Sequence, residues 1–299
     1  MKTVLITGTS KGIGFSAALA FARAGHQVAA TMRNPNGAPA LAEIAVRENL
    51  PITIFAMDVN HDLSVQEACT QINKQFGAID VLVNNAGIEG LGSVEEFPIE
   101  GFRAVMETNY FGVIRCIQAV LPSMRQSRSG CIINISSVAG RLASGSMSPY
   151  SATKFALESL SEILAQEVKA VGVRVAIVEP GIIDTQMSRH ITAIPGASPY
   201  SHQRRLSAIF TASLTRPVSP TLVADKLLEI ATGDSWQLRY PVGPDAAPFL
   251  GWRQSMSDEV WVELAGLSDE AWCDRIEKEL GMDLRSMVLG ATAAELHPH

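Results

Sequence analysis

The sequence predicts an α/β fold, in which a doubly wound parallel sheet is followed by a helical C-terminal extension. The first observation behind this prediction is that short apolar runs alternate with longer amphipathic runs, as in parallel sheets covered by helices on both faces. The second is a glycine-rich turn directly between the first strand and the first helix. The third is a length of 299 residues with 47% hydrophobic residues, which is enough for one large α/β domain.

Each element is predicted from its hydrophobic pattern. Short apolar runs predict buried strands at 3–6, 28–32, 52–57, 81–83, 132–135 and 173–178. Longer amphipathic runs between them predict helices at 14–24, 40–48, 63–76, 101–124 and 150–171. Ligands of such sheets bind beyond the carboxyl ends of the strands, so we expect functional residues directly after the strands.

The hydrophobic pattern changes after the sixth strand. Residues 185–220 are rich in Ser, Pro and Gly, and we expect a long irregular segment there. Such a segment is either a lid or a disordered insert, and its position beside the expected active site favours a lid. A helix at 221–231 and a short run at 236–240 complete the first domain, which we place at 1–245.

Residues 246–299 form the C-terminal extension, which we expect to be mostly helical and packed on the same domain. Ser268 is expected to open a helix that Gly281 closes. Trp272, Ile276 and Leu280 share one face of this helix, and a helix of this length needs a surface to rest on.

Composition narrows the function classes. The formal net charge is −6 and no stretch of Lys and Arg offers a basic face, so nucleic acid is not an expected partner. The four cysteines lack zinc spacing, and we expect them to be buried in a reducing compartment, without a metal. The first apolar run is too short for a signal peptide or a membrane span, so we expect a cytoplasmic protein.

A candidate nucleotide site lies at the turn after the first strand, where the spacing is G-x-x-x-G-x-G. Glycines permit a tight turn and close backbone approach to a pyrophosphate, and the following helix N-terminus offers free N–H donors. The expected contact residues are Gly8, Ser10, Lys11, Gly12, Ile13 and Gly14. The alternative is a turn that only joins the strand to the helix.

The end of the second strand indicates the type of nucleotide. NAD binders usually carry Asp or Glu there to hold the ribose 2′-hydroxyl, but this chain has Arg33 and no acid. Arg33 is suited to hold a 2′-phosphate through charge-assisted hydrogen bonds, and Lys11 adds a second positive charge. We therefore expect NADP(H), the alternative being that both are ordinary surface charges.

Tyr150 and Lys154 are the candidate acid/base pair. Four residues apart on a helix, they lie on one face. An ammonium about 4 Å from the phenolate would stabilise it by about 4 kcal/mol at an effective dielectric of about 20. We therefore expect Lys154 to lower the pKa of Tyr150 toward neutral pH.

With these motifs the chain resembles the short-chain dehydrogenase/reductase family, over residues 1 to about 240. The matches, in the family's order, are Thr7-Gly8-x-x-x-Gly12-x-Gly14, Asp58, Asn84-Asn85-Ala86-Gly87, Asn109, Ser137, Tyr150-x-x-x-Lys154 and Pro180-Gly181 with Thr185. The resemblance implies a single-domain Rossmann fold and hydride transfer between NADP(H) and a ketone, aldehyde or secondary alcohol. The tail after Tyr240 is longer than in compact members.

The resemblance also implies roles for these residues. Ser137 would bind the substrate oxygen, Tyr150 would move its proton, Lys154 would bind the nicotinamide ribose, and Asn109 would hold a water linked to Lys154. For Asn109 the alternative is that it only caps or kinks its helix. The remaining cofactor contacts would come from Asp58, Val59, Asn85, Ala86, Gly87, Pro180, Gly181, Ile183 and Thr185.

The substrate is expected to be a bulky apolar one, because most candidate wall residues are apolar. These candidates are the 185–220 segment and Ile88, Glu89, Leu91, Val138, Leu142 and Met147. Four basic side chains would either contact an anionic substrate or form a solvated face, namely His190, His202, Arg204 and Arg205.

Subunit pairing and two rival functions stay open at this stage. The family pairs the helices near 111–124 and 155–168 between subunits, which implies a homodimer or homotetramer, although a monomer core would show the same apolar stripes. One rival function is an NADP-binding sensor without turnover. The other is an epimerase or dehydratase on the same fold.

Overall fold

The computed structural model describes residues 1–192 and 198–295. Its centre is a seven-stranded parallel sheet in the order β3-β2-β1-β4-β5-β6-β7. The six predicted strands are confirmed within one or two residues at each end, and the run near 240 adds the seventh. Their bounds are β1 Thr3–Thr7, β2 Gln27–Met32, β3 Ile52–Ala56, β4 Val81–Asn84, β5 Gly130–Ile135, β6 Val173–Pro180 and β7 Arg239–Val242.

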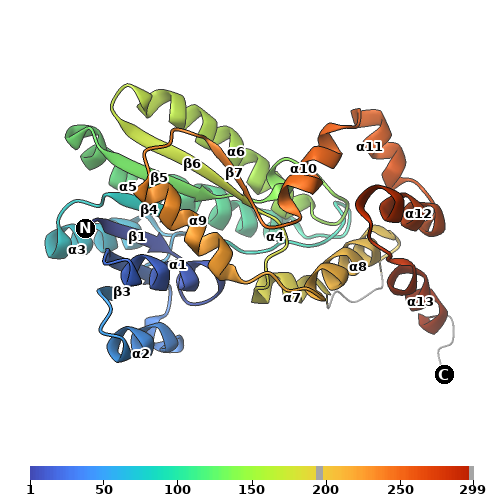
Figure 1. Ribbon diagram of the computed structural model, residues 1–299, viewed down its shortest axis with the longest axis horizontal. Helices are drawn as coiled ribbons and strands as arrows, with labels where there is room; N and C mark the ends of the chain where they lie inside the picture. Colours follow the sequence, from blue (N-terminus) through green and yellow to red (C-terminus); the bar gives the residue numbers. More distant parts are fainter. Residues whose placement is uncertain (193–197, 296–299) are drawn as a thin grey trace.

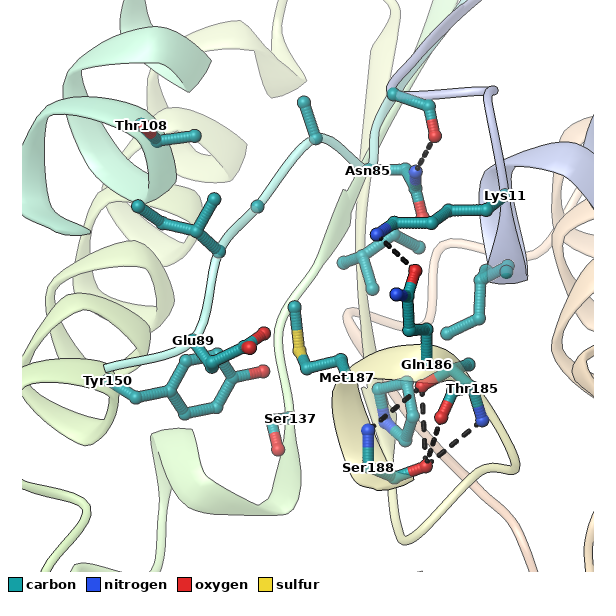
Figure 2. A pocket seen from close by; sticks show the side chains of 18 of the residues that line it. Lys11, Asn85, Glu89, Thr108, Ser137, Tyr150, Thr185, Gln186, Met187 and Ser188 are labelled. Atoms are coloured by element: carbon teal, nitrogen blue, oxygen red, sulfur yellow. Dashed lines mark hydrogen bonds between the residues drawn. The ribbon is translucent and has the colours of Figure 1, made fainter. Parts of the chain in front are cut away.

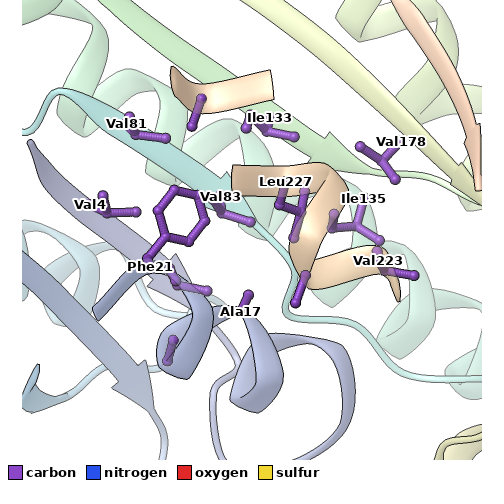
Figure 3. Packing of buried hydrophobic residues seen from close by; sticks show 14 of the residues in the cluster. Val4, Ala17, Phe21, Val81, Val83, Ile133, Ile135, Val178, Val223 and Leu227 are labelled. Carbon is purple, nitrogen blue, oxygen red and sulfur yellow. The ribbon is translucent and has the colours of Figure 1, made fainter. Parts of the chain in front are cut away.

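Helices cover both faces of the sheet (Figure 1). On one face lie α1 Gly12–Arg23, α2 Ala40–Arg47 and α9 Pro220–Thr232, and on the other α3 Asp62–Phe76, α5 Gly112–Ser127 and α6 Ser148–Lys169, with α4 Ile99–Met106 packed beside α6. Figure 3 shows the first of these interfaces, where Phe21 and Leu227 pack on the strand residues Val4 and Val83. The alternation of strands and helices in the sequence therefore produced the predicted doubly wound sheet.

A polar chain runs through the opposite interface. The Asn84 amide donates to Asn134 Oδ1 at 2.8 Å, and the Asn134 amide donates to Ser161 Oγ at 2.8 Å. These three residues connect β4, β5 and α6, and all are buried. Because an unpaired buried amide is costly, the chain fixes how α6 sits on the sheet.

The prediction of one regular helix at 101–124 is wrong in its middle. A π-helical turn, Glu107–Phe111, separates α4 from α5 and contains Asn109. Such a turn widens the backbone spacing within an otherwise continuous helix, and hydrophobic periodicity does not reveal it.

The prediction of an irregular segment at 185–220 is also wrong. The described part contains α7 Gln186–Thr192 and α8 His202–Leu214, whereas 193–197 lie outside the described residues. Ile191 and Leu206 are buried in a cluster with Met147 and Ala139, so tertiary contacts stabilise helices whose own pattern is weak.

The extension is helical, as predicted, with α10 Ala246–Gln254, α11 Asp258–Ala265, α12 Asp269–Leu280 and α13 Arg285–Glu295, and residues 296–299 lie outside the described part. The Ser268 hydroxyl caps α12 by accepting from the Ala271 amide, and Gly281 ends it in the left-handed conformation. Trp272 and Ile276 are buried, together with Ala208 of α8. The predicted apolar face therefore contacts the helices that follow the sheet.

Two arginines of α8 anchor α12. Arg205 donates to Asp269 Oδ1 at 2.7 Å and to the Ala265 carbonyl at 2.9 Å, and Arg204 donates to Asp269 Oδ2. Arg205 is only 4% exposed, so its buried guanidinium needs this carboxylate as a counter-charge.

Within the described part of the chain, no helix is long and apolar enough to cross a bilayer.

We predict that Asp269→Asn destabilises the protein by about 3 kcal/mol, because it leaves the buried Arg205 guanidinium without a counter-charge. Asp258→Asn is the matched control, since Asp258 pairs with Arg253 at the exposed start of α11. Thermal melting of both variants measures the effect. Equal melting temperatures for the two variants would contradict the anchoring role of Asp269.

Candidate active site

A cavity of about 480 Å³ opens at the carboxyl ends of the strands. Every residue predicted to bind the cofactor lines it except Gly14, and three of the four predicted catalytic residues, Ser137, Tyr150 and Lys154, line it as well. Figure 2 shows Lys11 and Asn85 on one side of the cavity, with Tyr150 and Ser137 across from them. Residues more than 140 positions apart in sequence, such as Gly8 and Tyr150, are thus brought to one place.

The glycine-rich turn is held by the loop after β4. Asn85 Nδ2 donates to the carbonyl oxygens of Thr7 and Gly8 at 2.8 and 3.0 Å. A Cβ on Gly14 would lie 2.4 Å from this amide nitrogen, and a Cβ on Gly8 would lie 2.8 Å from Ala86 Cα. Gly14 therefore acts behind the cavity, by leaving room for the Asn85 amide, while the N-terminus of α1 faces the cavity.

The side of the cavity beyond β2 is basic. Arg33 is exposed and lines the cavity, and no ion pair to its guanidinium occurs among residues 1–192 and 198–295. Lys11 Nζ donates to Gln186 Oε1, a neutral partner, at 2.5 Å. Asp58 follows β3, and its Oδ1 accepts from the Asn60 amide at 3.0 Å. The donor set fits a dinucleotide with an additional phosphate next to Arg33.

Tyr150 lies in the first turn of α6, and Lys154 follows one turn later. The Lys154 ammonium donates to the Ile135 carbonyl at 2.7 Å and lies 5.5 Å from the centre of the Tyr150 ring. Ser137, which follows β5, caps a short helical turn by accepting from the Ala139 amide at 3.1 Å. The hydroxyls of Ser137 and Tyr150 therefore enter the cavity from two separate elements.

The expected lowering of the Tyr150 pKa by Lys154 does not occur in this structure. Burial raises the pKa of Tyr150 to about 12, a hydrogen bond from Ser137 opposes the shift, and the Glu89 carboxylate adds to it. Burial also lowers the pKa of Lys154 to about 8, against the attraction of Glu158. The physical reason is that both groups are removed from water and the ammonium is directed at the Ile135 carbonyl.

Asn109 lies behind the cavity, not in its lining. Its Oδ1 accepts from the Ile88 amide at 2.9 Å, and its Nδ2 donates to the Ile88 carbonyl at 2.9 Å and to Thr153 Oγ1 at 3.1 Å. The residue thus joins the π-helical turn to the loop after β4 and to α6. Capping and kinking alone do not describe it, because it fixes the distance between two walls of the cavity.

Helix α7 forms a wall of the cavity in a region where the sequence predicted only an irregular segment. It contributes Gln186, Met187, Ser188, His190 and Ile191 to the cavity. The Glu89 carboxylate lies 3.0 Å from His190 Nδ1, so the Lys11–Gln186 and Glu89–His190 contacts connect α7 to both sides. The helical spacing of Met187 and Ile191 was the available signal for this helix.

The sequence left open whether four basic residues contact an anionic substrate or form a solvated face, and neither alternative describes Arg204 and Arg205. Their guanidiniums bind Asp269, and Arg205 is buried, so they neither form a solvated face nor offer charge to an anion. His190 faces Glu89, and burial lowers the pKa of His202. Among the described residues, no group of three His, Cys, Asp or Glu side chains is arranged to hold a metal.

The candidate substrate walls divide between two adjoining cavities. Ile88, Glu89 and Leu91 line the large cavity, whereas Val138 and Leu142 line a smaller one of about 140 Å³. Met147 and Ser137 line both. The substrate side of the site therefore extends past Ser137 toward the C-terminal helices.

Comparison with known proteins agrees with this geometry. The family model for short chain dehydrogenases matches residues 2–195. Oxidoreductase BOA17 of Botryotinia fuckeliana is 35% identical over 274 residues, which are 88% of this chain and 98% of the relative. A solved short-chain dehydrogenase from Streptomyces avermitilis is 33% identical with a TM-score of 0.74, covering 89% of this chain and 95% of its own.

A second solved structure, an actinorhodin polyketide ketoreductase with NADPH, is 26% identical with a TM-score of 0.73. The match covers 82% of this chain and 97% of that protein. The sheet, the glycine-rich turn and the Ser137, Tyr150 and Lys154 side chains at one cavity agree with these likenesses. The chain belongs to the short-chain dehydrogenase family.

Proposed function

We propose that the protein is an NADP(H)-dependent oxidoreductase that interconverts a bulky apolar ketone or aldehyde with the corresponding alcohol. The observation that carries this proposal is the convergence of Ser137, Tyr150 and Lys154 in one cavity whose far side holds Arg33, which has no ion pair within the described part of the chain. NADPH, when bound along the glycine-rich turn, supplies the hydride that adds to the carbonyl carbon.

The protein's own residues act on the carbonyl oxygen. The Ser137 hydroxyl donates a hydrogen bond to this oxygen, and Tyr150 transfers its proton to it, so that C=O becomes CH–OH. The raised pKa of Tyr150 keeps the phenol protonated at neutral pH, which is the form that donates. Lys154, whose ammonium donates to the Ile135 carbonyl at the cavity, is proposed to bind the nicotinamide ribose.

NADP(H) is favoured over NAD(H) by the charges at the end of β2. Arg33 is exposed at the cavity, and no carboxylate follows β2 to bind a free 2′-hydroxyl or repel a phosphate. The structural likeness to a ketoreductase with NADPH supports the same choice. Asn109 is proposed to position the loop after β4 and to hold the water that exchanges protons with Lys154.

Two rival functions fit the fold. A sensor without turnover would not need an acid, a hydrogen-bond donor and a lysine at one cavity, and this chain has all three. An epimerase or dehydratase remains the second candidate. A panel of ketones and alcohols, followed by nicotinamide absorbance, tests the choice, because net oxidation or reduction of the nicotinamide excludes both rivals.

We also propose a homodimer or homotetramer formed through α5 and α6. Phe111, Phe155 and Ile163 on or beside these helices are large apolar side chains that are 45%, 44% and 51% exposed. Light scattering of the purified protein tests this, and a monomeric mass would refute it.

The four cysteines are buried and form no disulfide with one another, which suits the proposed cytoplasmic location.

Tyr150→Phe is expected to lower kcat by about 10²–10⁴-fold, because it removes the proton donor and keeps the ring. NADPH affinity, measured by fluorescence titration, should stay close to that of the wild type. Tyr240→Phe is the control, since Tyr240 lies in β7 and bonds Ser235. Turnover of Tyr150→Phe within about tenfold of wild type would contradict the assignment.

Arg33→Asp should reverse the cofactor preference, because a carboxylate repels the 2′-phosphate and accepts from a free 2′-hydroxyl. The ratio of kcat/KM for NADPH to that for NADH should fall by about 100-fold or more. Arg125→Asp, an equal charge change at an exposed site on α5, should leave the ratio unchanged. Wild-type protein that uses NADH as well as NADPH would refute the 2′-phosphate argument.

The rate of alcohol oxidation should rise with pH as the Tyr150 phenolate forms, and Glu89→Gln should shift this rise to lower pH. Oxidation needs the Tyr150 phenolate, and the Glu89 carboxylate raises the pKa of Tyr150, so neutralising Glu89 lets the phenolate form earlier. The pH profile of kcat measures this shift, with Glu167→Gln on the exposed side of α6 as the control. If kcat of Glu89→Gln rises at the same pH as that of the wild type, or at a higher pH, Glu89 does not act on Tyr150.

A further inference from the structure

The smaller cavity, which we call the aromatic chamber, adjoins the proposed catalytic site. It has a volume of about 140 Å³. Ser137, Met147 and Phe210 are among the residues that line both it and the large cavity. A substrate whose carbonyl oxygen contacts Ser137 therefore has the chamber directly beside its carbonyl carbon.

Five Phe and Trp side chains line the chamber, and four of them come from the C-terminal extension. Phe210 of α8, Phe249 and Trp252 of α10, Trp261 of α11 and Trp272 of α12 all line it. Trp252 and Trp261 meet edge to face, with ring centres 5.1 Å apart. All five aromatic residues follow the region 2–195 that the family model matches, so the aromatic part of the chamber wall comes from outside that match, whereas Ser137 and Met147 come from within it.

Two indole N–H groups and one guanidinium that border the chamber are paired within the protein. Trp261 Nε1 donates to the Ala143 carbonyl at 2.8 Å, and Trp252 Nε1 donates to Glu279 Oε2 at 2.6 Å. Arg205 is bound by Asp269 and packs its guanidinium 5.2 Å from the centre of the Trp272 ring. The chamber thus offers ring faces and aliphatic groups to a ligand, with no free charge from Arg205.

Size and chemistry together define the occupant. An apolar cavity of about 150 Å³ in a protein interior holds one benzene molecule. The aromatic chamber has nearly this volume, and its aromatic side chains favour an apolar ring over an ionised group.

We propose that the aromatic chamber binds one ring-sized apolar group attached to the carbonyl carbon, so that the substrates are aryl or cycloalkyl ketones and the matching secondary alcohols. This inference rests on the proposed carbonyl-reductase function. It assigns the C-terminal extension the selection of the substrate, through the side chains that α10, α11 and α12 place beside Ser137.

The test is to reduce the volume of the chamber. Ala265 lines it at the end of α11 and is partly buried, so Ala265→Leu adds three carbons to the space. The ratio of kcat/KM for acetophenone to that for butanone should fall about tenfold or more. Ala247→Leu, an exposed site on α10 outside both cavities, should leave that ratio at the wild-type value.

A second variant enlarges the chamber. Leu280 lines it at the end of α12, and Leu280→Ala should raise kcat/KM for 2-acetylnaphthalene relative to acetophenone. The melting temperatures of all variants show whether they fold. An acetophenone-to-butanone ratio that is unchanged by folded Ala265→Leu, or wild-type protein that prefers butanone, would overturn the proposal.

A binding measurement separates this inference from the proposed function. Calorimetric titration of wild-type protein with cyclohexyl methyl ketone in the presence of NADP⁺ involves no turnover. Binding that Ala265→Leu weakens about tenfold, and Ala247→Leu does not, supports the chamber even if no ketone is reduced. Absence of binding in the wild type refutes the chamber, whereas reduction of butanone alone would keep the proposed function and refute only the ring-binding chamber.

Discussion

The junction between the carboxyl ends of β1 and β4 is the contact on which the rest of the site depends. The strand order reverses here, because β1 pairs with both β2 and β4, and such a switch point leaves a crevice above the sheet. Asn85 closes the junction by donating to the Thr7 and Gly8 carbonyls, in space that exists because Gly14 has no side chain. The nucleotide side and the substrate side of the cavity are positioned relative to each other through this contact.

Burial sets the charge states on the substrate side. Tyr150 and Lys154 are both removed from water, which raises the pKa of the phenol and lowers that of the ammonium. The same environment keeps Tyr150 in its proton-donating form and leaves Lys154 able to lose or regain a proton near pH 8. The spacing of Tyr150 and Lys154 predicted that the lysine activates the phenolate. Desolvation instead favours the neutral form of each side chain.

One carboxylate in the C-terminal extension pairs with two arginines of α8. Asp269, the first residue of α12, forms ion pairs with Arg204 and with the buried Arg205, and these pairs help to fix the aromatic walls against α8. Arg205 lines the chamber, and its ion pair with Asp269 directs the guanidinium charge to that carboxylate and not to a ligand. The Arg205–Asp269 ion pair therefore both anchors the extension and contributes to the apolar character of the chamber.

The sequence by itself determined the order of most strands and helices, the family, and most of the residues that line the large cavity. It could do so because strand periodicity, the glycine-rich turn and the Tyr150–Lys154 spacing are local patterns. Only the tertiary structure decided the π-helical turn at Asn109, the helices α7 and α8, the pKa of Tyr150 and the aromatic chamber. These features depend on desolvation and on contacts between distant residues, such as Arg205 with Asp269, which a local pattern does not encode.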